Sequence, residues 1–178
     1  MKRWHKIVLG TSGVIAALIA CGWLLPSTQQ VERQTIIRAT PKAVFPLIAT
    51  LKRWPEWTAW TVDRFPDLVT RFEGPDTGPG AIMVASGKSS GDGTVTITHA
   101  DVASGIHYTL DFSHGTQLFD GAISMSPQGD DLAMTWKLTA DLGANPFKRW
   151  AGLAMGALMG TDMASGLEKL RKRVEHSP

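Results

Sequence analysis

The stretch VERQTIIRATPKAVFPLIATLKRWPEWTAW, from Val31 to Trp60, decides the fold predicted for this chain. Residues 31–39 predict an edge strand, and Pro41 starts a helix over 41–51, because proline is favoured at the first helical position. An aromatic cluster follows, made of Trp54, Trp57 and Trp60. A short helix that leaves an edge strand directly and ends in aromatic residues favours a lid over a curved sheet. Such a lid usually covers a cavity.

The residues before this stretch predict a membrane anchor. No charged side chain occurs over residues 7–25, and a helix of that length can cross a hydrocarbon core of roughly 30 Å. Trp4 and Trp23 bracket the segment, as interfacial aromatic anchors do. Because the basic residues that flank it lie in 1–6, the positive-inside rule places residues 1–6 in the cytoplasm and the remainder outside.

Two alternatives to an uncleaved anchor stay open. The tetrapeptide Leu18-Ile-Ala-Cys21 resembles the site at which bacterial lipoproteins are cut and acylated, and an ordinary cleaved signal peptide also has a basic start and an apolar run. Against cleavage, the apolar run continues beyond Cys21 to Leu25. We therefore expect a single-pass protein of the bacterial inner membrane, with residues 26–30 as a short linker and a domain over 31–178 on the periplasmic side.

Length and charge restrict what this domain can be. The 147 residues after residue 31 suit one domain with a real core. Three of the 18 basic residues precede the anchor, which leaves 15 against 16 acidic residues, so the domain lacks the basic character of a nucleic-acid binder. Cys21 is the only cysteine, which excludes an intramolecular disulfide and argues against a thiol-ligated metal.

Beyond Trp60 the sequence predicts an antiparallel meander. Glycine-rich and proline-rich turns recur at near-regular spacing, and apolar residues alternate with polar ones, as in Ile106, Tyr108, Leu110 and Phe112. Such alternation is typical of strands with one buried face. With the first strand, seven strands are expected, over residues 31–39, 67–73, 80–86, 93–101, 105–112, 117–126 and 131–142.

A long helix is predicted from Pro146 to Arg173, with Asn145 as its N-cap. Its apolar stripe does not keep one phase. One group of residues shares a face, and a second group lies on nearly the opposite one, so a break or kink is expected at Gly160-Thr161. The two groups are Phe147, Trp150, Ala154, Ala157 and Leu158, and then Met163, Leu167, Leu170 and Val174.

The order of these elements is that of the helix-grip fold, and short motifs along the chain carry a family resemblance. The motifs are residues 31–39, Pro41-Lys-Ala-Val-Phe45, Trp54-Pro-Glu-Trp57, Glu73-Gly-Pro75 with Gly78-Pro-Gly80, Thr94-Val-Thr-Ile-Thr98 and Gly166-Leu-Glu-Lys-Leu170. Together they resemble the START-like SRPBCC superfamily, in particular its polyketide cyclase/dehydrase-like branch of bacterial proteins. The resemblance implies an α+β, Bet v 1-like fold, in which a seven-stranded antiparallel sheet wraps around the C-terminal helix. It also implies an apolar cavity for lipids or other hydrophobic molecules.

Several aromatic residues, methionines and one leucine are candidates to line that cavity, because soft methionines and broad aromatic rings suit an apolar guest. Each of them could equally fill a solid core. The candidates are Trp57, Trp60, Met83, Tyr108, Phe112, Met125, Met134, Trp136, Trp150, Met163 and Leu167.

Catalytic groups are harder to find. His99 is in phase with Val95 and Ile97 and is followed at the next position of that face by Asp101, so a histidine oriented by a carboxylate could act as a general base. The same pair could simply be two polar residues at a strand end. No residue pattern predicts a metal site or a cofactor, and the glycine-rich residues 87–93 lack the spacing of a phosphate loop and predict a hairpin connection.

The sequence is compatible with three functions. The first is a membrane-anchored domain that binds a hydrophobic small molecule or lipid. The second is a cyclase-like or dehydrase-like enzyme that acts on an apolar substrate. The third is a ligand-free module that docks a membrane partner of unknown identity, which a solid core combined with an exposed apolar patch would favour.

Overall fold

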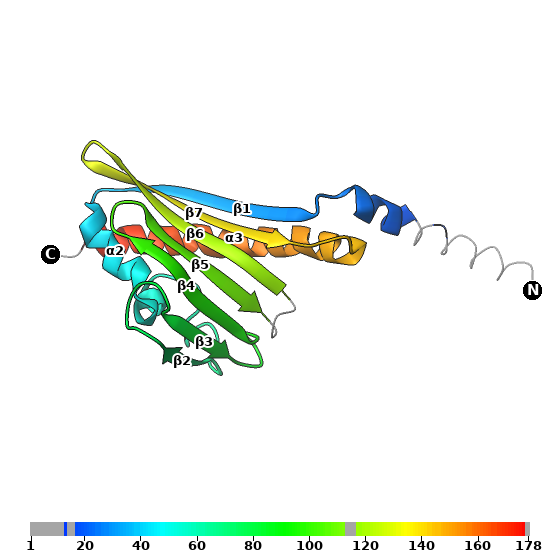
Figure 1. Cartoon of the computed structure of the whole chain (residues 1–178), viewed down its shortest axis with the longest axis horizontal. Helices are drawn as coiled ribbons and strands as arrows, with labels where there is room; N and C mark the ends of the chain where they lie inside the picture. The colour runs from blue at the N-terminus through cyan, green and yellow to red at the C-terminus, as the bar shows by residue number, and fades with distance from the viewer. Residues whose placement is uncertain (1–12, 14–16, 113–116, 177–178) are drawn as a thin grey trace, which may run out of the picture.

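The computed structural model describes residue 13, residues 17–112 and residues 117–176. One antiparallel sheet of seven strands, in the order β1-β7-β6-β5-β4-β3-β2, forms the body of the domain and confirms the predicted meander (Figure 1). The strands are β1 (Thr28–Ile37), β2 (Val69–Glu73), β3 (Ile82–Ser86), β4 (Gly93–Asp101), β5 (Gly105–Phe112), β6 (Gln117–Gln128) and β7 (Asp131–Asp141).

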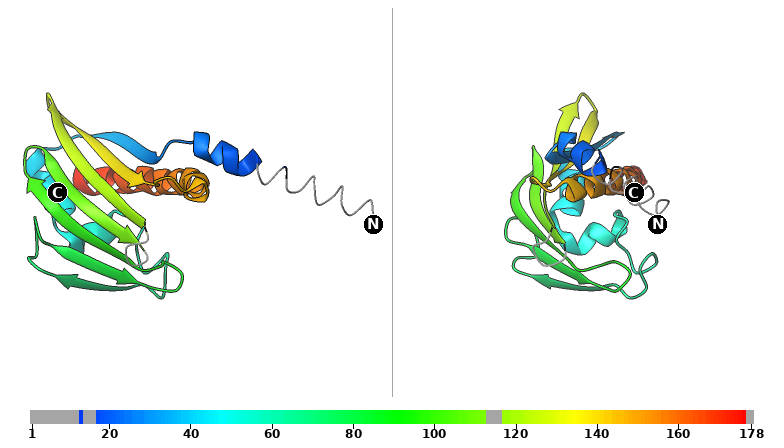
Figure 2. Two further views of the ribbon diagram at one scale, coloured as in Figure 1. Left: turned by 45° about the vertical axis from the view of Figure 1, so that its right-hand side comes forward. Right: turned by 90° about the vertical axis from the view of Figure 1, so that its right-hand side faces the viewer.

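The sheet curves around the long helix α3 (Pro146–Glu175), which lies in its concave side (Figure 2). The short helix α2 (Pro41–Ala49) and the 3-10 helix η1 (Leu51–Glu56) follow β1 directly and lie inside the same concave side. The predicted helix over 41–51 is therefore two elements. This arrangement is the expected helix-grip architecture, with a sheet wrapped around a C-terminal helix.

The first strand begins earlier than the sequence pattern indicated. Thr28, Gln29 and Gln30 pair with Asp141, Ala140 and Thr139 of β7, so residues 28–30, expected to be linker, belong to the sheet. Thr28–Gln30 are polar and resemble a linker in composition. Pairing with β7 nonetheless satisfies their backbone groups, which composition cannot reveal.

The two buried tryptophans of the predicted cluster fasten η1 to α2. The indole N–H of Trp54 donates to the Ile48 carbonyl at 2.9 Å, and that of Trp57 donates to the Leu47 carbonyl at 3.0 Å. These carbonyls lie in the last turn of α2, where no intrahelical partner remains. The rings of Trp54 and Trp57 are also in edge contact, with centroids 5.6 Å apart. The cluster therefore ends α2 and fixes the position of η1 over the sheet.

Helix α3 starts as predicted, because the Asn145 side chain accepts hydrogen bonds from the backbone N–H groups of Phe147 and Lys148. The break predicted at Gly160-Thr161 is absent, and the helix is continuous across it. The two apolar groups of residues that lie on nearly opposite faces are instead accommodated by one unbroken helix. In its first half α3 buries Gly152, Gly156 and Gly160 against the sheet side, with Met155 and Met159 partly buried beside them, and the other large apolar residues lie outward.

Within the described part of the chain, no helix is long and apolar enough to cross a membrane. Part of the segment predicted as an anchor, residues 7–12 and 14–16 of 7–25, lies outside the described residues. Residues 17–24 are described and are helical, and they lie beyond the Pro146 end of α3 (Figure 1). There the indole N–H of Trp150 donates to the Leu18 carbonyl at 3.1 Å.

Candidate ligand-binding site

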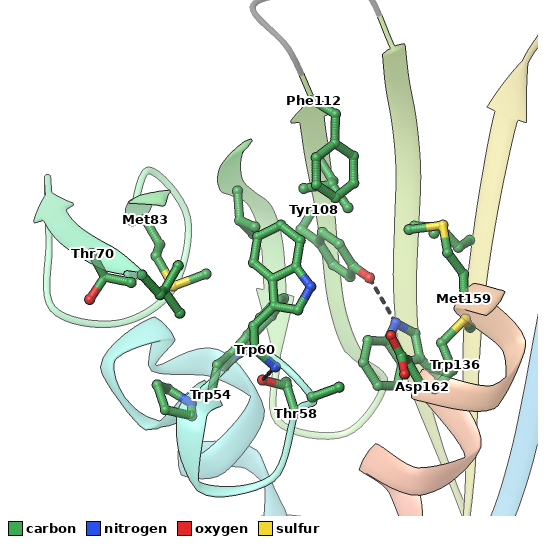
Figure 3. Close-up of a pocket in the computed structure, with 17 residues that line it drawn as sticks. Trp54, Thr58, Trp60, Thr70, Met83, Tyr108, Phe112, Trp136, Met159 and Asp162 are labelled. Carbon is green, nitrogen blue, oxygen red and sulfur yellow. Dashed lines mark hydrogen bonds between the residues drawn. The ribbon is translucent and has the colours of Figure 1, made fainter. Parts of the chain in front are cut away.

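A cavity of about 90 Å³ lies between η1, the sheet and the middle of α3 (Figure 3). Its wall is almost wholly apolar, which suits a hydrophobic guest. We call it the main cavity. Its lining residues are Trp54, Pro55, Thr58, Ala59, Trp60, Leu68, Thr70, Met83, Val95, Tyr108, Leu110, Phe112, Trp136, Leu138, Met159, Asp162 and Met163.

Tyr108 places one polar group inside this wall. Its phenol oxygen accepts a 2.7 Å hydrogen bond from the indole N–H of Trp136 (Figure 3). Burial raises the pKa of Tyr108 far above its ordinary value of 10.0, and the Trp136 bond only partly opposes that effect. The phenol is therefore protonated at neutral pH. Since it accepts from Trp136, its own hydrogen stays available to a ligand acceptor.

An ion pair lies at the rim of the main cavity. Asp162 of α3 is the only charged residue of the wall, and its carboxylate receives a 2.7 Å hydrogen bond from the Arg64 guanidinium. Arg64 belongs to the segment that joins η1 to β2. Both side chains are partly exposed, so the pair marks where the cavity meets solvent and connects that segment to α3.

A second cavity of about 70 Å³ lies further along α3, between its first half and strands β1, β6 and β7. Leu138 and Met159 line both cavities and so stand between them. Neither cavity alone reaches the roughly 300 Å³ of a typical ligand pocket. Methionine is flexible and unbranched, so Met159 is the side chain whose movement would most readily join the two spaces.

Comparison with known families agrees with this architecture. The family described as "Polyketide cyclase / dehydrase and lipid transport" matches residues 28–175. The chain belongs to this family. The resemblance stated from the sequence is therefore confirmed for the domain, and the match begins with the residue that starts β1. A search among curated proteins found no significant relative.

Solved structures of the same fold are distant in sequence. Protein CV1439 from Chromobacterium violaceum is 15% identical, with a TM-score of 0.55 over 84% of this chain and 99% of its own. Ara h 8.0201 is 12% identical, with a TM-score of 0.56 over 84% and 99%. The di-domain ARO/CYC protein StfQ, from the steffimycin biosynthetic pathway, is 11% identical, with a TM-score of 0.62 over 83% of this chain and 51% of its own. At these identities the likeness establishes the fold alone.

In this polyketide cyclase-like domain, six of the eleven predicted lining residues border the main cavity, namely Trp60, Met83, Tyr108, Phe112, Trp136 and Met163. Trp57, Met125, Met134 and Leu167 are buried in the core and line neither cavity. Trp150 was predicted to face inward, and the structure places it on the outer side of α3 with 40% of its surface exposed. The prediction fails there because glycines take the inward positions of this helical segment.

Several lining residues were missed by sequence reasoning. Val95, Leu110 and Leu138 belong to alternating strands, so their side of the sheet was predictable but their place at a cavity was not. Trp54 was part of the predicted lid cluster. Met159 and Asp162 could not be predicted from the sequence pattern. They reach the wall because α3 turns its glycines toward the sheet, which places these two residues beside the cavity.

The candidate catalytic pair, His99 and Asp101, lies outside the main and second cavities. A register shift in β4 between Ile97 and His99 turns His99 to the exposed side, so the expectation that it shares the buried face of Ile97 is wrong. Its ring is instead beside that of His107, with centroids 6.0 Å apart. Asp101 caps a turn, where hydrogen bonds from Ser104 hold the pKa of its carboxyl below the usual value.

This placement removes the basis for a general base at His99, because neither residue of the pair lines the main or the second cavity. The ionisable groups of the main cavity are Tyr108 and Asp162 alone. Over the residues that the structure describes, no three histidine, cysteine or acidic side chains are grouped to hold a metal ion.

Proposed function

We propose that this protein binds an elongated apolar molecule that carries a hydrogen-bond acceptor, and that its N-terminal apolar segment tethers it to a membrane. The observation that supports the ligand class most directly is the main cavity, an apolar chamber with a buried phenol as its inner polar group. An acyl chain with a carbonyl or carboxyl oxygen matches that combination. Family membership supports a hydrophobic ligand in general terms.

The shape of the ligand follows from the two adjoining spaces. The main and second cavities meet at Leu138 and Met159, so a narrow guest that displaces Met159 would extend from one into the other. A broad, rigid guest would have to move the η1 lid and the Arg64–Asp162 pair as well. We therefore favour a flexible chain over a fused-ring molecule.

The membrane tether rests on the sequence. Residues 7–25 have the length and apolar character of an anchor, and lipophilic ligands partition into bilayers. A tethered domain would meet such ligands at their highest local concentration. Cleavage of the segment, or acylation at Cys21, would change the attachment but not the ligand class.

The test is titration of the purified full chain in detergent-free nanodiscs with a dansyl-labelled fatty acid of eleven carbons, followed by competition with unlabelled fatty acids of increasing length. Saturable binding at one site per chain is expected. Met159→Ala should shift the preference toward longer chains, because it widens the passage between the cavities. Met125→Ala is the matched control, since Met125 is a buried methionine that lines neither cavity. Absence of saturable binding, with the fold intact by circular dichroism, would overturn the proposal.

An enzymatic role is a second candidate, favoured by one observation. Tyr108 is a buried acid in an apolar chamber, and its raised pKa keeps it protonated. Such a phenol can hydrogen-bond to a substrate carbonyl and stabilise developing negative charge there, but it cannot remove a proton at neutral pH. If Tyr108→Phe abolishes a discovered turnover while fatty-acid competition is unchanged, the enzymatic role gains over simple binding.

A further inference from the structure

The first half of α3 is apolar on both of its sides. Between Trp150 and Thr161 the sequence contains no charged residue. The side toward the sheet is buried through Gly152, Gly156 and Gly160. A helix that is hydrophobic all round is normally covered on every side, either by protein or by lipid.

The other side of this half is exposed. Phe147, Trp150, Leu153 and Leu158 have 65%, 40%, 42% and 71% of their surface accessible, and alanines occupy the outward positions between them. We call these four residues the outer face of α3. A contiguous apolar surface of this kind marks a contact with another molecule or with a membrane.

Lipid is the occupant that the neighbouring residues favour. The described end of the N-terminal apolar segment lies against the start of the same helix, where Gly22 packs so closely on Pro146 that an added Cβ would lie 2.6 Å from the proline Cβ. This segment exposes Leu18, Trp23 and Leu24, the last at 86%. The outer face of α3 therefore continues onto a segment whose sequence predicts an anchor.

Hydrogen bonds at this junction also suit a membrane interface. The Arg149 guanidinium donates to the carbonyls of Trp23 and Leu25, each at 2.8 Å. These carbonyls end the helical segment and would otherwise need water, which is scarce below the headgroups. Exposed tryptophans on both elements, Trp23 and Trp150, are the residues that membrane interfaces enrich.

We propose that the outer face of α3 lies in the bilayer interface, so that the domain rests on the membrane along the first half of this helix instead of hanging from a flexible tether. The second cavity borders this half of α3 through Met155 and Gly156. In this orientation the second cavity is the part of the ligand site nearest to the lipid. The inference rests on the tether of the proposed function and does not depend on the ligand.

The test uses spin labels on the full chain with Cys21→Ser as background, reconstituted in vesicles of phosphatidylcholine and phosphatidylglycerol. One label is placed at Leu158→Cys and a matched one at Lys169→Cys. Lys169 is exposed and lies about three turns further along the same side of α3. Collision rates with oxygen, which concentrates in lipid, and with a water-soluble nickel chelate give the depth of each label.

We expect the label at Leu158 to collide severalfold more with oxygen and severalfold less with nickel than the label at Lys169. Equal values at the two positions would overturn the proposal. Low collision rates with both reagents at Leu158 would also overturn it, in favour of a protein partner or a second copy. Fatty-acid binding by the same labelled samples separates this result from failure of the ligand proposal.

Discussion

The two halves of α3 belong to one continuous helix, yet they relate to the sheet in opposite ways. The second half places Met163, Leu167 and Leu170 inward and exposes charged residues such as Lys169. The first half places glycines and the partly buried Met155 and Met159 inward, and its other large apolar residues outward. Hydrophobic residues in the second half thus stabilise the fold, whereas the four residues of the outer face in the first half form a surface. Apolar character alone does not tell these two uses apart.

Truncating one leucine in each half should give the largest contrast. Leu170 is fully buried, so Leu170→Ala should lower the free energy of unfolding by about 2–5 kcal/mol through lost burial and a residual cavity. Leu158→Ala should change it by less than about 0.5 kcal/mol, as exposed substitutions do. Urea unfolding followed by tryptophan fluorescence measures both. A cost at Leu158 that equals the cost at Leu170 would mean that protein covers the outer face.

The second half also supports the polar group of the main cavity, because Trp136 lies on Gly166 and bonds to Tyr108. Tyr108→Phe leaves the buried indole N–H of Trp136 without its acceptor and should cost about 1–3 kcal/mol. Tyr108 is the only tyrosine of the chain, so its titration can be followed directly by tyrosinate absorbance.

Burial raises the pKa of Tyr108, so the folded protein favours the neutral phenol. The stabilisation is fully present below about pH 10, the ordinary pKa of tyrosine, and is lost as the pH rises from there toward the folded value. Tyrosinate absorbance should therefore appear only together with unfolding. Titration at pH 10 in a folded protein would show that the phenol reaches water.

Two glycine substitutions sharpen the contrast between the halves. A Cβ at Gly166 would lie 2.9 Å from the Trp136 ring, which is held by Tyr108 and by edge contact with Trp57. A Cβ at Gly160 would clash with the guanidinium end of Arg33, which can move, and would otherwise lie 3.4 Å from Cγ1 of Val31. Alanine gains about 1 kcal/mol of helix propensity at either position.

Gly160→Ala should therefore stabilise the protein by up to about 1 kcal/mol. Gly166→Ala should destabilise it by about 1 kcal/mol, because overpacking a rigid site outweighs the gain in propensity. Thermal unfolding of the two variants side by side measures the difference. Stabilisation by both would show that Trp136 moves as freely as Arg33, and destabilisation by both would show that Arg33 is held as rigidly as Trp136.

The smallest effect is expected at the C-terminal end of α3, where Arg173 bonds to Glu56 of η1 at 3.0 Å. Arg53 lowers the pKa of Glu56 most, and Arg173 adds to this effect. Glu56→Gln should cost less than about 1 kcal/mol, as exposed ion pairs do. High salt should shrink the cost, and so should a pH below about 4, where the carboxylate is protonated in the unfolded state. A loss of stability that does not change with salt would show that Glu56 contributes through packing and not through its charge.

Elements with local sequence signals were predicted accurately, and features that depend on neighbouring elements were not. The strands of residues 93–101 and 105–112 were predicted at their observed bounds because alternation and glycine turns are local signals. The register shift beside His99 and the inward glycines of α3 were not predictable in this way. Both depend on how a neighbouring strand fits, which no local pattern records. The same glycines explain why Trp150 was assigned to the cavity and Met159 was missed.

The glycine contacts of α3 bear on how the molecule opens. Gly152, Gly156 and Gly160 bring little side-chain surface to the interface, and Met155 and Met159 are only partly buried there, so we expect that detaching the first half exposes less apolar area than detaching the second. Thr161 also bonds back to the Ala157 carbonyl at 3.2 Å, a contact that bends helices. Local opening should therefore be confined to the part of α3 before Thr161, and backbone amides there should exchange hydrogen faster than those after it. Such opening would uncover the second cavity while the core stays folded, giving a hydrophobic guest of the kind proposed above a route that needs no global unfolding.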